Sequence, residues 1–552
     1  MTGSAAAEAP QAVLRRALPA ALAAHGRGAL DEAWRLLDEA ARVAPRHPDM
    51  LHLRGLVALG RGDAADGVAW IERAVAASAG TALYRNNLGV ARRASGDLPG
   101  AIAAHREAIA LKPDYAAAHN NLGAVLAACE EFADAANAFA RAAALDPRLV
   151  DAVANEALAR VQCDEAAAAL GLVEDALARR GPTSRMRLAQ GAALTALGRH
   201  DEAATALDDA VTMAPDDPEA WHNLGYVFQR LGQNEAACLA FDRALALDPL
   251  RRSTHSSRGL VRLSMGDFER GWRDYRRRRK GPGAPGDVPP TPLPHDLRAR
   301  TITIARDQGV GDDLFFLRFA PELVRRGAAL RLDVEPRLLP MLARAGFAVG
   351  RGGETILSGD LPFRLDHRED AACPPSLRLA PLDAKVREQA QLLAGAGPKP
   401  WIALSWRAGV RRQKKLAPPE ALARALSGLP GTVVIVQRGL LPGERAEFEA
   451  VLGRRVVDAS AANEDLEAML ALMLVADIHV AVSNTNLHLR AAVGRRTHVL
   501  LPFPSEWRWR AGTHGEPVWF RDHRCYRQDA DGDWNAAFAA LRGDLALLAP
   551  GM

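Results

Sequence analysis

A polar turn between a strand and a helix is the first stretch that could bind a ligand. An apolar strand ends at Val482, and a helix-like run extends from Leu487 to Val493. Between them stand Ser483, Asn484, Thr485 and Asn486. Free backbone N–H groups and the helix dipole favour an anion such as a diphosphate at such a helix start. Asn484 or Asn486 would serve equally well as a cap that only stabilises the helix.

An acidic loop supplies a candidate general base. DQGVGDD, residues 307–313, follows the strand expected at 301–305 and precedes a helix expected at 314–326. Gly309 and Gly311 permit a tight turn and close backbone approach, and Asp312 lies where the helix begins. Its carboxylate could take the proton of an acceptor hydroxyl. It could also be an N-cap, unless Asp313 is the cap and leaves Asp312 free.

Two further loops carry cations at strand ends. One follows Trp401–Trp406 and contains Arg407, Arg411, Arg412, Lys414 and Lys415. The other follows Thr432–Gln437 and contains Gln437 and Arg438. Each alone resembles a charged surface loop, but arginine and lysine at strand ends could neutralise phosphates. The four loops together favour a nucleotide-phosphate ligand in one cleft.

The elements around these loops predict parallel sheets. Short apolar strands are expected at 301–305, 329–334, 401–406, 432–437, 477–482 and 497–502, with helices at 314–326, 419–429 and 466–475. Alternation of strand and helix is typical of α/β folds with helices on both faces. GAGPKP, residues 395–400, divides the region into two lobes, 300–397 and 398–545, with a ligand cleft expected between them.

The first half of the chain is a repeat array. Glycine recurs with a step of 34 residues at Gly55, Gly89, Gly123, Gly191, Gly225 and Gly259, with Ala157 in the one unit that lacks it. Alanines at fixed later positions and a closing proline complete the tetratricopeptide signature, best seen at Trp221 to Pro249. About eight units over residues 14–280 predict an α-solenoid, because one unit cannot bury its own apolar face.

Asparagines could line the inner face of this solenoid. Asn87, Asn121 and Asn223 lie on the first helix of their units and could bind the backbone of an acceptor peptide; Asn86 and Asn120 stand beside two of them. Alternatively, such side chains bond neighbouring helices. The array ends in the basic run 270–281, interpreted as a solvated helix face with Trp272 and Tyr275 packed inward. A proline- and glycine-rich linker or draped segment follows at 281–299.

Composition excludes several classes of protein. The 552 residues carry a net charge of +4, which does not by itself argue for nucleic acid. The N-terminus lacks the features of a signal peptide, and no apolar run is long enough to span a membrane. Five scattered cysteines without a C-x-x-C pair indicate neither disulfides nor a zinc site. We therefore expect a cytoplasmic protein.

The second half resembles the glycosyltransferase domain found behind tetratricopeptide repeats in many bacterial proteins. The matching stretches are DQGVGDDLFFLRFAPEL, WRAG, VQRG, SNTNLHLRAAVGR and LLPFPSEWRW. The domain is similar to the heptosyltransferases of glycosyltransferase family 9, and the layout to protein O-GlcNAc transferases. The resemblance implies a GT-B fold of two Rossmann-like lobes, with the acceptor on the N-terminal side and a nucleotide-sugar donor mainly on the C-terminal side. It implies no metal or cofactor.

The resemblance also implies roles for particular residues. Gly311 and Asp312 match a Gly-Asp pair whose aspartate is the base. Gln437, Arg438 and Gly439 match a Gln-Lys-Gly loop, and His488 matches a donor-side histidine. Trp507, Arg508 and Trp509 match a tryptophan-rich tail. Ser483 and Asn484 stand where the family has Asp-Thr, so donor contacts here rest on hydroxyl and amide groups instead of a carboxylate.

The hypothesis is an inverting, metal-independent glycosyltransferase whose repeats recruit a protein or peptide. Asp312 would be the base, with donor contacts from Gly309, Gly311, Arg407, Gln437, Arg438, Ser483, Asn484, Thr485, Asn486 and His488. The rival hypothesis is a non-catalytic repeat adaptor with a degenerate transferase-like domain. Nucleic acid is not an expected partner, because basic and aromatic residues do not interleave on a surface pattern.

Overall fold

The computed structural model describes residues 10–278, 291–408, 415–512 and 515–548, and it divides into two compact units, 1–223 and 224–552. The division lies within helix α13 (Pro218–Arg230). The domain limits expected from the sequence follow the repeat pattern and stay a prediction. Residues 281–290 of the expected linker lie outside the described segments.

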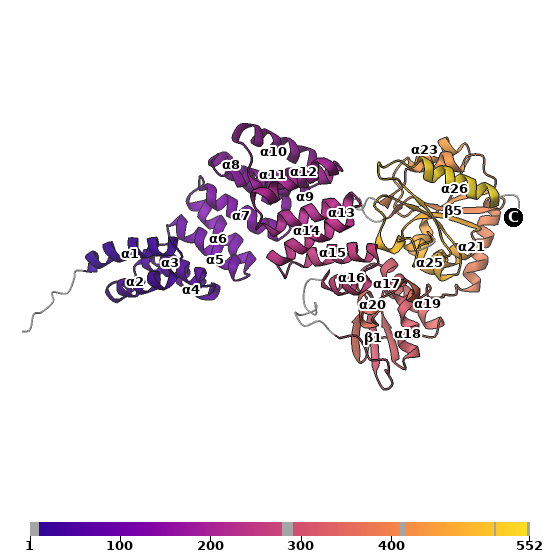
Figure 1. The fold of residues 1–552 in the computed structure, drawn as a ribbon, viewed down its shortest axis with the longest axis horizontal. Helices are drawn as coiled ribbons and strands as arrows, with labels where there is room; N and C mark the ends of the chain where they lie inside the picture. Colours follow the sequence, from indigo (N-terminus) through magenta and orange to yellow (C-terminus); the bar gives the residue numbers. More distant parts are fainter. Residues whose placement is uncertain (1–9, 279–290, 409–414, 513–514, 549–552) are drawn as a thin grey trace, which may run out of the picture. The chain divides into compact units, whose positions relative to one another are not determined.

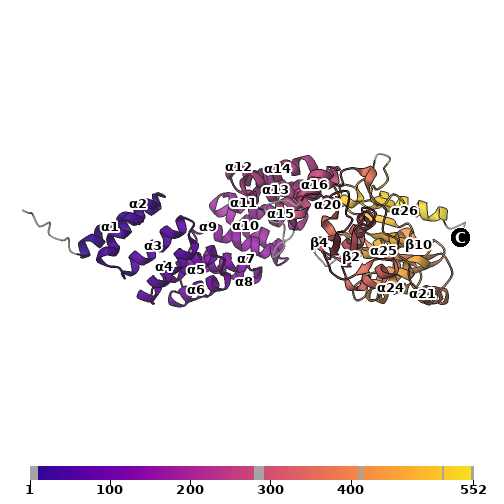
Figure 2. The ribbon, with the colours of Figure 1, turned by 90° about the horizontal axis from the view of Figure 1, so that it is seen from below.

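Residues 10–275 form sixteen α-helices, as expected for about eight two-helix units. Figure 2 shows that the helix pairs of the first compact unit follow one another along the array. The helices of the first compact unit, up to the shared helix α13, are α1 (Pro10–Gly26), α2 (Leu30–Val43), α3 (Pro48–Gly60), α4 (Ala64–Ala77), α5 (Ala82–Ala94), α6 (Leu98–Leu111), α7 (Ala116–Ala128), α8 (Phe132–Leu145), α9 (Val150–Gln162), α10 (Ala166–Arg180), α11 (Ser184–Leu197) and α12 (His200–Met213). The second compact unit continues with α14 (Asn234–Leu247), α15 (Arg252–Met265) and α16 (Phe268–Tyr275).

The small residues of the 34-residue step let the two helices of a repeat approach closely. A Cβ atom added at Gly123 would lie 2.9 Å from the Phe139 ring, and one added at Gly225 would lie 2.8 Å from the Phe241 ring. In both repeats the ring stands sixteen positions later, on the second helix. The glycine therefore provides the space that a second-helix side chain fills.

A second 34-residue ladder marks the turn inside each repeat. One residue per turn has a positive φ, between 64° and 89°, and glycine occupies six of the eight positions because it adopts this conformation without steric cost. The eight residues are Gly28, Gly62, Gly96, Glu130, Asp164, Gly198, Gly232 and Gly266. This ladder supports the count of eight repeats independently of the helix-packing glycines.

The remaining residues form two parallel sheets. The first sheet has the order β3-β2-β1-β4 and the second the order β12-β11-β10-β5-β8-β9, and every neighbouring pair in both is parallel. β6 (Arg407–Ala408) and β7 (Lys415–Leu416) form a separate antiparallel pair. The other strands are β1 (Thr301–Ala305), β2 (Ala329–Asp333), β3 (Ala348–Val349), β4 (Glu354–Leu357), β5 (Trp401–Ser405), β8 (Thr432–Ile435), β9 (Val457–Asp458), β10 (Ile478–Val482), β11 (His498–Leu501) and β12 (Arg524–Arg527). All six strands expected from the sequence are present.

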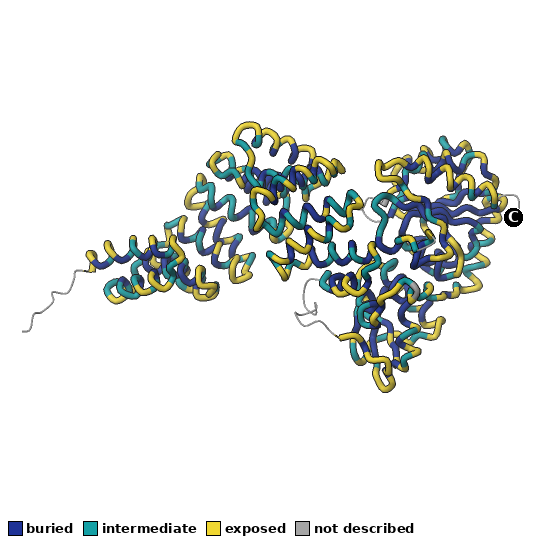
Figure 3. The backbone as a smooth tube through the Cα atoms, in the orientation of Figure 1, coloured by how far each residue is buried: buried dark blue, intermediate teal, exposed yellow. Residues whose placement is uncertain are grey.

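Helices cover both faces of the second sheet. Side chains alternate along its strands, so Ala403 faces the layer that contains α24 and α25, whereas Ile402 and Leu404 face α22, α23 and α26. Figure 1 shows α23 and α26 on one side of the sheet around β5 and α25 on the other, and Figure 3 shows its strands buried. The helices of this region are α17 (Val310–Phe316), α18 (Ala320–Arg325), α19 (Leu339–Arg344), α20 (Leu361–Arg364), α21 (Asp383–Ala396), α22 (Pro419–Leu426), α23 (Glu444–Leu452), α24 (Leu466–Val475), α25 (Thr485–Ala492) and α26 (Asn535–Leu548).

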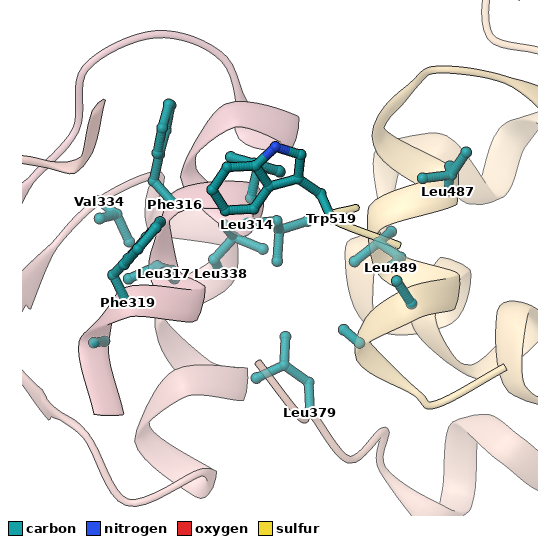
Figure 4. Packing of buried hydrophobic residues seen from close by; sticks show 14 of the residues in the cluster. Leu314, Phe316, Leu317, Phe319, Val334, Leu338, Leu379, Leu487, Leu489 and Trp519 are labelled. Carbon is teal, nitrogen blue, oxygen red and sulfur yellow. The ribbon is translucent and has the colours of Figure 1, made fainter. Parts of the chain in front are cut away.

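One hydrophobic core joins the last repeat to both sheets. It contains Trp272 of α16, Phe315 of α17 and Trp519 of the segment between β11 and β12, all at most 3% exposed. Figure 4 shows Trp519 between the α17 residue Leu314 and the α25 residue Leu489. The end of the expected linker is draped over the first sheet's layer: Leu297 is fully buried, and its N–H donates to the Arg326 carbonyl at 2.7 Å.

Candidate functional site

Asp312 lies in the first turn of α17, directly after the loop that leaves β1. Its Oδ2 accepts a hydrogen bond from the Gly309 N–H at 3.2 Å, so the carboxylate satisfies one free donor at the helix start. Its Oδ1 accepts a hydrogen bond from the guanidinium of Arg508. Asp312 remains partly exposed, with 23% of its side chain accessible.

Asp313 is not the cap that would leave Asp312 free, and that alternative was wrong. Asp313 is fully buried and accepts hydrogen bonds from Ser358 Oγ at 2.9 Å and from the Glu335 N–H at 3.2 Å. Burial raises the pKa of this carboxyl to about 6, against the opposing effect of the Ser358 hydrogen bond. The two neighbouring aspartates thus have different environments.

Arg508 approaches Asp312 from the segment after β11. Its guanidinium lies 4.8 Å from the ring centre of Phe315 and 4.9 Å from that of Trp507, and Glu506 stands 3.6 Å away. Burial lowers the pKa of Arg508, but the negative charges of Asp312 and Glu506 have the larger combined effect and raise it above its usual value, so the guanidinium stays charged. The aromatic rings hold this cation beside the carboxylate.

The polar turn before α25 contains a helix cap. Asn484 Oδ1 accepts from the Leu487 N–H at 3.2 Å, and Asn484 Nδ2 donates to Ser405 Oγ at 2.8 Å. Asn486 is buried and donates to the Val436 carbonyl at 3.2 Å, so it is not the cap. Ser483, 6% exposed, is buried beside the capping residue.

The first turn of α17 packs against the start of α25. A Cβ atom added at Gly311 would lie 3.2 Å from the His488 ring and 3.5 Å from Thr485 Oγ1. His488 is buried, with its ring 6.1 Å from that of Phe315. The structure therefore brings the first turn of α17, which carries Gly311 and Asp312, against the start of α25, although the two helices follow strands of different sheets.

The polar groups of Gln437 and Arg407 bind partners within the protein. Gln437 Oε1 accepts from the backbone N–H groups of Trp406 at 3.0 Å and Arg407 at 2.9 Å. The Arg407 guanidinium pairs with Glu444 at 2.7 Å. Arg438 is exposed, and its Nη2 lies 3.6 Å from Glu464 Oε1. Donor contact by these residues stays a prediction. Arg411, Arg412 and Lys414 lie outside the described segments, as does the side chain of Lys415.

The start of α25 and the start of α17 each lie at a topological switch point, where the chain has added strands on both sides of one strand. In the second sheet the chain leaves β5 on one side and returns to its other side as β10; Ser405 is the last residue of β5, and Asn484 follows β10. In the first sheet β1 lies between β2 and β4, and Asp312 follows β1. Ligands of parallel sheets bind at such switch points.

A cavity of about 1000 Å³ lies within the second compact unit, and Asp312 is on its wall. One side is formed by residues of α13, α14 and α15 beyond residue 223, and by Tyr275 and Arg278 at the end of the last repeat. The other side is formed by the segments that follow β1, β11 and β12. Among the residues predicted from the sequence as site members, Asp312 is the one that lines this cavity in the described structure.

The sequence interpretation missed several cavity residues and was only partly right about the basic run at 270–281. Arg270 and Arg273 of α16 are exposed, as expected of a solvated face. Beyond the helix, however, Arg276 is 4% exposed, and the Arg278 side chain is 7% exposed. Arg278 pairs with Asp307 and Asp360, which follow β1 and β4. These carboxylates offset the cost of burying the cation. Trp272 and Tyr275 pack inward as expected.

The asparagines of the first unit bond neighbouring repeats. Asn87 Nδ2 and His52 Nε2 are 2.8 Å apart, and Asn121 Nδ2 donates to Asn86 Oδ1 at 3.1 Å. These contacts agree with the alternative that such asparagines bond neighbouring helices. Peptide binding by Asn87, Asn121 and Asn223 stays a prediction. Asn155, one 34-residue step after Asn121, was missed; its Oδ1 accepts from Arg185 at 3.1 Å.

Comparison with models of known protein families identifies the repeats of the helical half. A TPR repeat model matches residues 89–128 and 191–232, and tetratricopeptide repeat models match residues 18–82 and 218–251. The helical array consists of tetratricopeptide repeats. These matches lie within the repeat region and confirm the expected solenoid.

Protein FlbA of Caulobacter vibrioides is 26% identical to this chain over 419 residues, covering 62% of this chain and 69% of FlbA. That share exceeds the repeat region, so the similarity extends into the α/β part. Among solved structures, a tetratricopeptide repeat protein from Parabacteroides merdae shares 17% identity, covering 42% of this chain and 91% of its own, with a TM-score of 0.37. YrrB, described as a TPR protein with an unusual peptide-binding site, shares 20% identity, covering 33% and 95%, with a TM-score of 0.26.

Two further findings concern the helices and the acidic, histidine and cysteine side chains of the described segments. Every helix in them is too short or too polar to span a lipid bilayer. They also contain no group of three or more histidine, cysteine or acidic side chains arranged to hold a metal ion.

Proposed function

We propose that this protein is a glycosyltransferase that moves a sugar from a nucleotide-sugar donor to a protein or peptide hydroxyl. One observation carries the proposal: Asp312 lies on the wall of a cavity bordered by tetratricopeptide helices and by loops at the carboxyl ends of both parallel sheets. A peptide guided by the repeats would reach Asp312 through this cavity. The resemblance to GT-B transferases supports the same assignment.

Asp312 is the proposed general base. The acceptor hydroxyl loses its proton to the Asp312 carboxylate, its oxygen forms a bond to the anomeric carbon of the sugar, and the bond from that carbon to the diphosphate breaks. The nucleoside diphosphate leaves with both bonding electrons. The inverting outcome follows from the family resemblance. Arg508 orients the carboxylate and must yield one of its contacts when the hydroxyl binds.

The start of α25 is the proposed donor site. Asn484 lies at the switch point of the second sheet, and the helix start directs its dipole toward an anion there. Gly311 and Thr485 place this helix start beside the first turn of α17, which carries Asp312. The arrangement would set the anomeric carbon of a bound donor between the diphosphate and the base. No metal is part of the proposal.

A non-catalytic adaptor is the second candidate, and a specific observation favours it. Both Asp312 oxygens already accept hydrogen bonds, one from Arg508 and one from Gly309. The charge of Arg407 is likewise paired with Glu444. In this reading the tetratricopeptide repeats bind a protein, and the α/β part serves as a scaffold.

Donor binding and turnover separate the two candidates. Purified protein is screened by thermal shift against UDP-, GDP-, ADP- and dTDP-sugars, and a donor at ~100 times its Kd should stabilise the fold by about 2.7 kcal/mol. Transfer to acceptors from lysate is then followed with the donor that binds. An enzyme loses turnover and keeps donor affinity in Asp312→Asn. Absence of both binding and turnover with every donor would favour the adaptor.

A further inference from the structure

The cavity beside Asp312 carries excess positive charge. Five arginines line it, Arg230, Arg278, Arg508, Arg510 and Arg527, against the three carboxylates Asp307, Asp312 and Glu506. All three carboxylates are already matched within the lining, because Arg278 pairs with Asp307 and Arg508 pairs with both others. The carboxylates of the cavity therefore leave the other arginines uncompensated.

Two of these arginines keep an unmatched charge. Arg510 pairs with Asp370, which does not line the cavity. Arg527 donates to two neutral oxygens, Ser505 Oγ at 2.8 Å and also the Trp509 carbonyl, and it makes no ion pair with a described carboxylate. Arg230 at the end of α13 likewise has no ion pair among the described residues. A ligand in this cavity therefore meets two free cations.

Two repeat turns contact the segment after β11, which lines the same cavity as these cations. A Cβ atom added at Gly232 would lie 2.7 Å from the Phe503 ring, and one added at Gly266 would lie 2.7 Å from the Arg510 guanidinium. Gly232 and Gly266 are equivalent positions of successive repeats, so the segment after β11 contacts the same turn position in two neighbouring repeats. Arg230, two residues before Gly232, and Arg527, at the end of β12, both line this cavity.

We propose that the acceptor segment occupying this cavity is an acidic peptide, with carboxylates beside the hydroxyl that faces Asp312. This inference rests on the proposed function, because it names the chemistry of the acceptor. Carboxylates of the peptide pair with Arg230 and Arg527, while Gln229 offers an amide group to its backbone. The same charges exclude basic peptides, since like charges repel in a partly enclosed space.

Binding of labelled peptides tests the proposal without any need for turnover. Fluorescein-labelled serine peptides flanked by glutamates, glutamines or lysines are titrated with the full chain, and affinity is read from fluorescence anisotropy. The glutamate peptide should bind most tightly and weaken as salt is added, and the lysine peptide least tightly. Equal affinity for the three peptides would overturn the proposal.

Charge reversal locates the effect. The double variant Arg230→Glu, Arg527→Glu should bind the glutamate peptide about tenfold more weakly and should gain affinity for the lysine peptide, because attractions are removed and repulsions added. Arg243→Glu, at an exposed arginine of α14 outside the cavity, should bind as the wild type does. Arg230→Gln with Arg527→Gln provides a milder pair should the reversal disturb folding, and melting curves check this.

Nucleotide binding supplies the competing outcome. A nucleoside diphosphate is also an anion, so UDP and GDP are titrated against the same variants. If the double variant loses nucleotide affinity and keeps its affinity for the glutamate peptide, the arginines serve the donor and the proposal fails. Peptide selectivity without glycosyl transfer to any peptide would retain the acidic partner and reject the transferase instead.

Discussion

The carboxylate of Asp312 and the guanidinium of Arg508 form an ion pair although 196 residues separate them in the chain. The two side chains follow strands of different sheets, β1 and β11. Arg508 is held by Phe315 and Trp507, which belong to the core shared by the last repeat and both sheets. The orientation of the proposed base therefore depends on how the two sheets are joined.

Replacing Arg508 should disturb the proposed base. In Arg508→Ala, transfer should fall by about 100-fold because Asp312 loses its orienting partner, and stability should fall by about 1–3 kcal/mol. Arg508→Lys should retain more activity, since it keeps the charge but loses the planar fork. Steady-state rates and melting temperatures are compared with the exposed control Arg495→Ala. Full activity in Arg508→Ala would contradict this role.

The asparagine contacts between repeats should be structural. Asn86 Oδ1 lies 3.1 Å from both Asn121 Nδ2 and the fully buried His105 Nδ1. Asn86→Ala should lower the free energy of unfolding by about 1–3 kcal/mol, because buried donors lose their partner. Urea unfolding followed by circular dichroism measures this against Asn137→Ala, an exposed asparagine of α8. Equal stability of the two variants would show that the contacts contribute little.

His523 should make the second sheet's layer sensitive to acid. Both of its ring nitrogens are buried without a partner in the described structure, and burial lowers its pKa from 6.5 to about 3, with Arg318 adding to the effect. Below pH 6.5 the unfolded histidine takes a proton that the folded one refuses, so stability falls as the pH drops. His523→Phe removes this loss and should gain about 2 kcal/mol at pH 5 relative to pH 8.

Melting temperatures of wild type and His523→Phe at both pH values test this expectation. His479 and His498 also have pKa values lowered by burial, and they remain in the variant, so part of the acid sensitivity persists. A gain of the same size at pH 5 and pH 8 would indicate better packing instead of a suppressed titration.

Asp313 should produce the opposite pH dependence. Its pKa is raised from 3.8 to about 6, so the folded state keeps a proton that the unfolded state has lost, and stability falls as the pH rises through this range. Asp313→Asn does not titrate and can still bond Ser358 and the Glu335 N–H. Between pH 4 and pH 7, relative stability should shift toward the variant by up to about 3 kcal/mol. A difference that does not change with pH would refute the assignment.

Local patterns predicted most elements of this chain. The repeat step, four strands of the second sheet (β5, β8, β10 and β11) and α24 (Leu466–Val475) were expected, because each is a run of residues with one period. β3, β4, β9 and β12 were not expected, and a strand as short as the two residues of β3 or β9 has no pattern of its own. The expected strand at 432–437 ends at Ile435, because Gln437 turns inward to bond Trp406 and Arg407.

The candidate site was only partly predictable for a related reason. The residues at strand ends were found because strand, loop and helix follow one another in the sequence. The ion-pair partners of those residues were not predicted: Asp312 pairs with Arg508, and Arg407 pairs with Glu444. The pairing of the buried Arg278 with carboxylates was not predicted either. A basic run has the same composition whether it faces water or opposite charges.

The sequence by itself determined the tetratricopeptide array, the two parallel sheets and the candidate base Asp312, because helix and strand periods and glycine spacing are local properties. Only the tertiary structure decided that Arg230 and Arg527 share a cavity with Asp312. Arg230 lies on a repeat helix, Arg527 is the last residue of β12, and Asp312 lies in the helix that follows β1. Their proximity arises from packing of Trp272, Phe315 and Trp519 in one core, which no local pattern encodes.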